Sequence, residues 1–362
     1  MVQSIEKDVI EMVKVLSLNV PFVHMTWAPY SHLVSIGQQQ EGFQNWALST
    51  LVNIVGVYGD KGSTPFLRYV NSPDPSSTYA YGNVWDACPY VEKLTIDRSF
   101  IRSMGQDISD FVIKNINANN YMYLYLLRDL NTRFAHQTLI YGYDLERKVF
   151  LVADHFEGEG GRYSTKLISM ENMPLHYNIQ QDDILEYELD VYKYVYLIKS
   201  QPYDFELNLK SLKRSFLDYL NSTPTVLNIN AAAEGKQKKY NDTYYYGIDF
   251  YTPLMGYIHR EIANENNESC DHRPLAFFKE SKKITCLLVE YLFENSFVTD
   301  KSLIEASDEI FQISAILLGL YLKYSVSKDA KILDKIVSRL TELREMDKKF
   351  IFHLIKDLEA LD

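Results

Sequence analysis

The stretch 133-RFAHQTLIYGYDLERKVFLVADHF-156 decides the fold that we expect for the N-terminal half of the chain. Residues 136–144 and 148–156 are rich in β-branched and aromatic side chains, and a polar turn separates them, so the pattern predicts a β-hairpin. In an antiparallel pair, the start of the first strand lies beside the end of the second strand. We therefore expect His136 and Asp154 to be neighbours in the sheet.

A histidine beside an aspartate can act as a general base. The carboxylate accepts a hydrogen bond from one imidazole nitrogen, which fixes the tautomer and leaves the other nitrogen free to take a proton. Each residue also has a structural interpretation, with His136 bonded to a backbone carbonyl and Asp154 capping the turn before the loop 155–161. His155 is an alternative partner for a nucleophile, although strand alternation sends its side chain to the sheet face opposite that of Asp154.

The rest of the N-terminal half places helices before further strands. Spacings of three and four between apolar residues predict the helices, and alternating or β-branched runs predict the strands. We treat residues 60–90, rich in Gly, Pro, Ser and Asp, as irregular. Helices followed by a run of antiparallel strands predict an α+β domain. The expected helices are 4–16, 28–40, 44–57 and 104–119, and the further strands are 121–127, 162–169 and 191–200.

The C-terminal half has the pattern of helices. Apolar residues recur at helical spacing through most of it, while the polar segment 222–247 is expected to be a loop. We therefore predict two domains, an α+β domain at 1–203 and an all-α helical domain at 204–362. The expected helices are 207–221, 271–295, 302–325 and 328–361.

Composition limits the classes of partner and compartment. The 362-residue chain has a formal net charge of −11, which argues against a general nucleic-acid surface. Its three cysteines are too few and odd in number for a disulfide framework, so we expect a reducing cytoplasm. No Cys or His spacing indicates a metal site, and we see no signal peptide. The longest apolar run, 313–322, is too short to span a bilayer, so we expect no membrane partner.

A His-Asp pair needs a nucleophile, and the N-terminus of a buried helix suits one. There the helix dipole and unpaired amides lower the pKa of a thiol and can stabilise an oxyanion. The best candidate helix is 28-APYSHLVSIGQ-38, because Pro29 suits the first turn. The residue at its tip is Ala28, which has no reactive group. Ser31 and Cys88 are the alternatives if the nucleophile lies elsewhere.

The motifs together resemble a known group of enzymes. His136, the segment Gly142-Tyr143-Asp144, Asp154, the tryptophan-bearing helix 45–55 and the segment 272–295 resemble papain-like cysteine peptidases of the bacteriocin-processing sort. More closely, they resemble the butirosin-type acyltransferases of natural-product clusters. The resemblance implies a papain-like N-terminal domain, with helices packed on an antiparallel sheet, followed by an all-α C-terminal domain.

The resemblance also implies an activity. The family forms amides: a cysteine takes an acyl group from the phosphopantetheine thioester of an acyl or peptidyl carrier protein, and an amine accepts it. The synthases of thioamide peptide antibiotics such as closthioamide look like kin. Ala28 then occupies the nucleophile position, His136 is the base and Asp154 orients it. Trp27, His24 and Tyr143 are candidates for substrate binding. No resident cofactor and no metal are expected, and the acidity of the chain suits a diamine or polyamine acceptor.

The alanine at position 28 departs from the family pattern, which has cysteine there. Ala28 could be a Cys-to-Ala variant made to trap a substrate, a natural loss of the nucleophile, or a sign that the alignment is wrong. The same residues would serve a cysteine peptidase or hydrolase, in which water accepts the acyl group. A catalytically dead papain-like binding protein is the third possibility.

Overall fold

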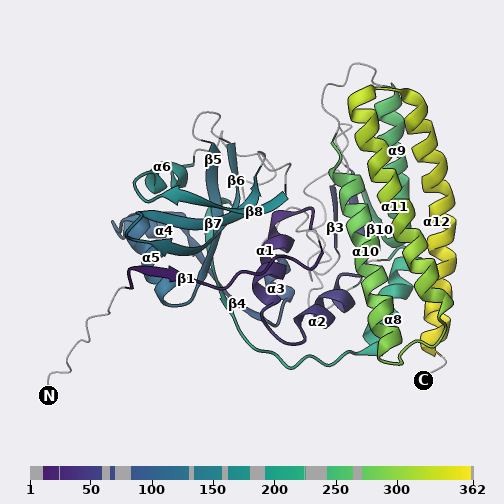
Figure 1. Ribbon diagram of the computed structural model, residues 1–362, viewed down its shortest axis with the longest axis horizontal. Coiled ribbons are helices and arrows are strands. Elements are labelled where there is room, and N and C mark those ends of the chain that lie inside the picture. Colours follow the sequence, from purple (N-terminus) through teal and green to yellow (C-terminus); the bar gives the residue numbers. More distant parts are fainter. Residues whose placement is uncertain are drawn as a thin grey trace. The chain divides into compact units, whose positions relative to one another are not determined.

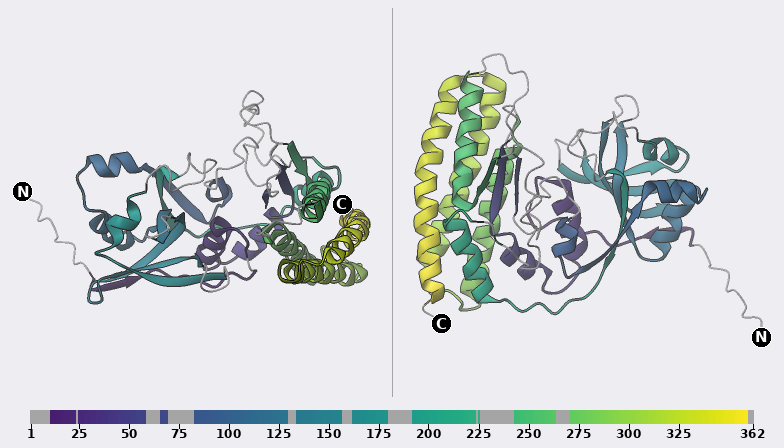
Figure 2. Two further views of the ribbon diagram at one scale, coloured as in Figure 1. Left: turned by 90° about the horizontal axis from the view of Figure 1, so that it is seen from above. Right: turned by 180° about the vertical axis from the view of Figure 1, so that it is seen from behind.

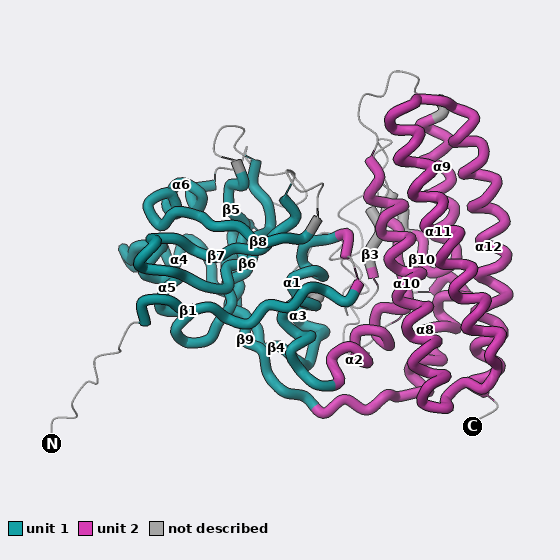
Figure 3. Tube along the Cα trace, viewed as in Figure 1, with its two compact units in different colours: residues 1–22, 27–41, 79–203 teal, residues 23–26, 42–78, 204–362 magenta. Residues whose placement is uncertain are grey.

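The computed structural model describes most of the chain, in two compact units that we treat separately (Figure 3). The first unit comprises residues 1–22, 27–41 and 79–203, and the second comprises 23–26, 42–78 and 204–362. The described residues are 11–23, 25–58, 66–69, 83–129, 134–156, 162–179, 192–223, 225, 243–263 and 271–359.

The described strands of the first unit form a seven-stranded antiparallel sheet (Figure 1). Six strands lie in the order β4-β9-β5-β6-β7-β8, and β1 pairs with β6 away from this path. A mixed fold of helices and an antiparallel sheet, as the sequence predicted, is therefore confirmed. The strands are β1 (Val13–Val15), β4 (Val91–Asp97), β5 (Tyr121–Asp129), β6 (Phe134–Asp144), β7 (Val149–Phe156), β8 (Arg162–Ser169) and β9 (Tyr194–Ser200).

The predicted hairpin forms the centre of this sheet. β6 pairs with β7 from Asp144 opposite Val149 to Leu139 opposite Ala153, with a register shift at Gly142. A side-chain Cβ at Gly142 would lie 2.7 Å from the backbone oxygen of Lys14, so only glycine lets β1 approach β6 this closely. The pairing brings the first residues of β6 beside the last residues of β7.

The helix that begins at Ala28 packs against this hairpin. α1 (Ala28–Gly37) contacts both β6 and β7, and all of its residues are buried. The helix has proline in its first turn, where the missing N–H costs no hydrogen bond. The other helices described in this unit are α3 (Asn83–Ala87), α4 (Arg98–Ser103), α5 (Ile108–Asn117) and α6 (Met173–Tyr177).

The second unit combines long helices with a small antiparallel sheet in the order β10-β2-β3. Figures 1 and 2 show the three longest helices side by side, with α11 in contact with both α10 and α12. Its elements are α2 (Phe43–Thr50), β2 (Ile54–Tyr58), β3 (Phe66–Tyr69), α8 (Leu209–Leu220), β10 (Thr243–Tyr246), η4 (Gly247–Phe250), α9 (Tyr251–Ala263), α10 (Arg273–Glu294), α11 (Ser302–Ser327) and α12 (Ala330–Glu359).

Three expectations for the N-terminal half were wrong in detail. The helix expected at 44–57 ends at Thr50, and the β-branched run that follows forms β2, because β3 and β10 offer it pairing partners. Within the segment 60–90, expected to be irregular, the structure has the strand β3 and the helix α3. The sequence analysis did not predict β4, which follows this segment. The end of the helix expected at 4–16 is the strand β1, while residues 1–10 lie outside the described residues.

The division into units differs from a simple cut of the chain. The chain passes from the first unit to the second between Tyr203 and Asp204, but residues 23–26 and 42–78 also belong to the second unit. The region 204–362 contains β10 and is therefore not purely helical. Backbone pairing of β10 with β2 joins this region to a segment that precedes it by almost two hundred residues.

One helix in the described part of the chain could cross a membrane by length and composition. It is α11, whose most apolar window has a mean hydropathy of 1.4. This helix packs against α10 and α12 along one face, and 28% of its most apolar window is buried.

Candidate active site

The sheet brings His136 and Asp154 into direct contact. Nδ1 of His136, near the start of β6, lies 2.7 Å from Oδ1 and 3.0 Å from Oδ2 of Asp154, near the end of β7. These are the distances of a charge-assisted hydrogen bond. The two residues that the sequence selected as neighbours are therefore paired in the structure.

Arg128, near the end of β5, adds a positive charge to this pair. Its Nη2 lies 3.2 Å from Oδ2 of Asp154 and 2.8 Å from Nδ1 of His136. A guanidinium can only donate hydrogen bonds, and Nδ1 must itself be a donor if it bonds the carboxylate. We therefore infer that the guanidinium of Arg128 and the Nδ1–H of His136 both donate to Asp154. Arg128 lies close to Nδ1 because the two groups bind the same carboxylate.

Asp154 is a fully buried carboxylate surrounded by donors. Besides His136 and Arg128, it accepts hydrogen bonds from Oγ1 of Thr138 at 3.2 Å and from the backbone N–H of His155 at 2.6 Å. Burial, the largest single influence, acts to raise the pKa of Asp154. The charge and hydrogen bond of His136 and the charge of Arg128 outweigh it, and the pKa falls to about 2. Asp154 is therefore ionised at neutral pH.

His136 remains accessible on its other side. Its side chain is 25% exposed, and Nε2 has no hydrogen-bond partner among the described residues. The ring of Phe134 stacks beside it, with centroids 6.1 Å apart and 30° between the planes. An imidazole held at Nδ1 by an ionised carboxylate, with a reachable Nε2, is equipped to take and return a proton.

The first residue of α1, at the nucleophile position expected from the sequence, has no reactive group. Ala28 is buried, and its side chain is a methyl group. The helix contacts the two strands that carry His136 and Asp154, and its N-terminal amides provide a partial positive charge at Ala28. The arrangement supplies a base, its orienting carboxylate and an electropositive helix end, without a nucleophile at that end.

The structure also brings together Ser31, the alternative nucleophile, and His155, the alternative partner for a nucleophile. Oγ of Ser31 lies 2.9 Å from Nε2 of His155. Ser31 is 0% exposed and Ala28 is 3% exposed, so both positions of α1 are buried. The ring of His155 also contacts the ring of Tyr163 edge-on, at 5.6 Å. We assign this contact to packing, because it fastens α1 to β7.

His32 is a buried histidine with a structural role. Burial, the main cause, lowers its pKa to about 4, so the ring is neutral at pH 7. Nε2 lies 3.3 Å from the backbone oxygen of Gln137 and must carry the proton, while Nδ1 accepts from the hydroxyl of Tyr163 at 3.0 Å. His32 thus ties α1 to β6 and β8.

Of the three candidates for substrate binding, the structure places Tyr143 away from the pair. Tyr143 lies seven residues from His136 along β6, roughly 23 Å of strand, and is 0% exposed. Its hydroxyl is 2.6 Å from Oδ1 of Asn117, so it holds α5 to the sheet. Trp27 is the N-cap residue of α1, directly before Ala28. His24 lies outside the described residues.

The alternative nucleophile Cys88 is a packed thiol. It is buried, and burial raises the pKa of its thiol to about 12. A thiol that stays protonated at neutral pH is a poor nucleophile. Cys88 is therefore not suited to replace the residue missing at position 28.

Sequence reasoning missed Arg128 and Thr138. Thr138 stands two residues after His136, so strand alternation alone places it on the same sheet face. Arg128 lies in the strand before β6, and Leu126 pairs with His136 in the register of β5 and β6. The end of β5 lies beside the start of β6, so an arginine there could have been included by the same argument that paired His136 with Asp154.

Comparison with known proteins adds no relative. No protein-family model matches the chain, and no curated protein matches it. Among the described residues, no group of three or more His, Cys, Asp or Glu side chains is placed to hold a metal ion.

Proposed function

We propose that the first unit has a papain-like fold and that its site is that of an amide-forming acyltransferase whose nucleophile position is occupied by Ala28. The observation that carries the proposal is the hydrogen bond between His136 and Asp154 on two strands against which α1 packs. The motifs that resemble butirosin-type acyltransferases support the choice of reaction. The acyl donor in this proposal is a carrier-protein thioester, the acceptor is an amine, and the compartment is the cytoplasm.

The chemistry can be written for an Ala28→Cys variant. Nε2 of His136 takes the thiol proton, and the thiolate attacks the carbonyl carbon of the carrier thioester. The bond between that carbon and the carrier's sulfur breaks, the sulfur takes the proton from His136, and the acyl group is left on the introduced cysteine. Asp154 stabilises the imidazolium that forms between these proton transfers.

The second half of the reaction reverses these roles. The nitrogen of the amine attacks the new thioester, and His136 takes a proton from that nitrogen. The bond between carbon and the cysteine sulfur breaks, and His136 returns the proton to the sulfur. The product is an amide, the thiol is regenerated, and neither an oxidant nor a reductant is needed.

Ala28 itself favours a second candidate function. A methyl group cannot form an acyl-enzyme, so the chain with this sequence would bind an acyl donor without turnover. Such a protein would serve as a scaffold or as protection against a reactive thioester. Restoring the thiol distinguishes the acyltransferase from the binding protein, because a site that has lost its catalytic function would not react even with a cysteine at position 28.

The experiment compares the unaltered chain with Ala28→Cys against a panel of acyl thioesters of N-acetylcysteamine. Intact mass is measured before and after adding diamines, monoamines or buffer alone. We expect a stoichiometric acyl adduct on Ala28→Cys only, discharged faster by amines than by water. Discharge by water at an equal rate would mean a hydrolase. If no thioester gave an adduct, the remaining candidate would be a protein that binds the acyl donor without turnover.

A further inference from the structure

The helix α11 has two faces with opposite surroundings. One face is buried against α10 and α12 along a regular stripe of alternating three- and four-residue spacing. This stripe includes Ser307 and Ser314, whose hydroxyls bond carbonyls of their own helix and allow the neighbouring helices to approach closely. The buried positions are Leu303, Ser307, Ile310, Ser314, Leu317, Tyr321 and Tyr324.

The opposite face of α11 is exposed and has the same spacing. Ile316 at its centre is 59% exposed, and Val326 near its end is 87% exposed. From Phe311 to Leu322 the helix carries no charged residue, and the middle of this face presents the apolar side chain of Ile316 to water. The exposed positions of the stripe are Glu305, Glu309, Gln312, Ile316, Gly319, Lys323 and Val326.

Two charges of this face, Glu309 and Lys323, lie at equal distances from Ile316. Glu309 precedes Ile316 by seven residues and Lys323 follows it by seven, two helical turns or about 10.5 Å on each side. Neither side chain forms an ion pair with another part of the chain that the structure describes. An antiparallel copy of the same helix, with Ile316 opposite Ile316, would place each glutamate opposite a lysine.

A glycine next to the centre has no role within its own chain. Gly319 is exposed in the interior of the helix, where glycine is less favourable than alanine. A Cβ built on Gly319 would meet no atom within 4 Å, so no neighbouring element of this chain requires its absence. The missing side chain leaves room for a second backbone or side chain to approach α11 one turn from Ile316.

We infer that the outward face of α11, defined by the stripe from Glu305 to Val326, docks on the same face of a second copy, with the two helices antiparallel. Two equivalent ion pairs between Glu309 and Lys323 flank an apolar centre formed by Ile316 from each copy. This is an isologous contact, in which one patch is complementary to itself. The inference does not depend on the proposed function of the first unit.

A lipid surface is the competing occupant for such an apolar helix. The stripe itself contains Glu309, Gln312 and Lys323, and a bilayer disfavours charged and polar side chains within its hydrocarbon core. The negative charge of Glu309 and the positive charge of Lys323 lie at equal distances from Ile316. They therefore favour a protein surface that presents a lysine opposite the glutamate and a glutamate opposite the lysine. A helix pair about 39 Å long is a small interface, so we expect a dissociation constant on the order of micromolar.

The test measures the mass of the full chain by sedimentation equilibrium across a concentration series. We expect a monomer–dimer equilibrium that Ile316→Glu weakens at least tenfold. Leu94→Glu is the matched control, because Leu94 is 58% exposed in the first unit. A monomer at all concentrations, or equal weakening by the control, overturns the inference. Circular dichroism of each variant verifies that the helices are intact.

Charge reversal tests the antiparallel arrangement. Glu309→Lys and Lys323→Glu should each weaken the dimer, since each places like charges opposite one another twice. The double variant should restore the affinity, and the differences should shrink at high salt. A double variant that is no better than the singles excludes this pairing. If the chain is monomeric but binds phosphatidylcholine vesicles, and Ile316→Glu removes that binding, a membrane is the occupant.

Discussion

The backbone N–H of Thr26 donates a hydrogen bond to Oε2 of Glu280, 2.5 Å away, within the second unit. The hydroxyl of Tyr69 donates to Oε1 of the same carboxyl at 2.9 Å. Glu280 is buried in α10. Burial raises that pKa to about 7, although the bonds from Thr26 and Tyr69 act to lower it.

Glu280 should make the stability of the fold depend on pH. Between about pH 4.5 and pH 7 the folded protein holds a proton on Glu280 that the unfolded chain releases. The free energy of unfolding therefore falls as pH rises through this window, by up to about 3 kcal/mol, and is level above it. Urea unfolding at pH 5 and pH 8 should show this fall in the wild type and a smaller fall in Glu280→Gln. Glu345→Gln, on the exposed side of α12, is the control and should keep the full dependence.

Asp154 should make the free energy of unfolding rise with pH, which is the opposite of the effect of Glu280. Its pKa is about 2 in the folded chain, below the ordinary value of 3.8. The ionised carboxylate contributes about 2 kcal/mol to the free energy of unfolding above about pH 3.8. This contribution is lost as pH falls through about 2. Asp154→Asn should be less stable than the wild type by at least this amount at pH 7, and the difference should narrow toward pH 2. A difference that does not change with pH would show that Asp154 is not ionised in the fold.

Asp154 should also govern the chemistry of a restored thiol. In the Ala28→Cys background, Asp154→Asn should slow acylation by on the order of 10³, because His136 loses the group that fixes its tautomer. Ser31→Ala in the same background should keep the rate within about threefold, since we assign the Ser31–His155 contact to packing. Stopped-flow release of the leaving thiol gives both rates. Equal losses in the two variants would contradict the assignment of roles.

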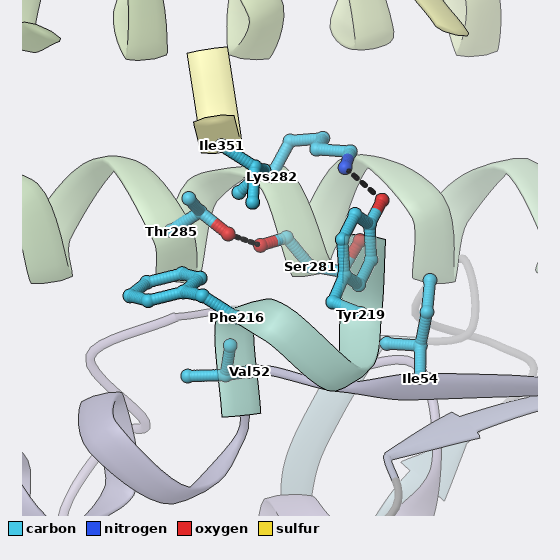
Figure 4. Close-up of a pocket in the computed structure, with 8 residues that line it drawn as sticks. All are labelled: Val52, Ile54, Phe216, Tyr219, Ser281, Lys282, Thr285 and Ile351. Atoms are coloured by element: carbon cyan, nitrogen blue, oxygen red, sulfur yellow. Dashed lines mark hydrogen bonds between the residues drawn. The ribbon is translucent and has the colours of Figure 1, made fainter. Parts of the chain in front are cut away.

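The buried ion pair of the second unit should be costly to break. Nζ of Lys282 lies 2.5 Å from Oδ2 of Asp347 and 2.9 Å from the hydroxyl of Tyr219, which itself donates to Asp347 at 2.6 Å. Figure 4 shows Lys282 and Tyr219 beside a cavity of about 10 Å³, room for about one water molecule. The cavity is lined by Val52, Ile54, Phe216, Tyr219, Ser281, Lys282, Thr285 and Ile351.

Removing one partner of this pair leaves a buried charge without compensation. Lys282→Met should lower the free energy of unfolding by about 3–5 kcal/mol. Lys282→Met combined with Asp347→Leu should be less destabilised than the single variant, because no charge is then left buried. Arg339→Ala breaks the exposed pair with Glu342 and should cost less than about 1 kcal/mol. Additive losses at Lys282 and Asp347 in urea unfolding would show that the two residues are not coupled.

The sequence by itself determined the pairing of His136 with Asp154. Side chains alternate along a strand with a period of two, and a short hairpin fixes which residues lie opposite one another. Both rules act over a few residues, so they operate without knowledge of the rest of the fold. The same local rules predicted the strand 162–169 and the long C-terminal helices within a few residues of their ends.

Only the tertiary structure decided what surrounds that pair and which unit each segment joins. The run Ile54–Tyr58 continues the apolar spacing of the preceding helix, and it is a strand because β3 and β10 supply its hydrogen bonds. Ser31 reaches His155, and His32 reaches Tyr163, through contacts between elements distant in sequence. Such contacts depend on how whole elements pack. Local periodicity carries no information about that packing, so the sequence could identify the base and its orienting carboxylate but not the complete site.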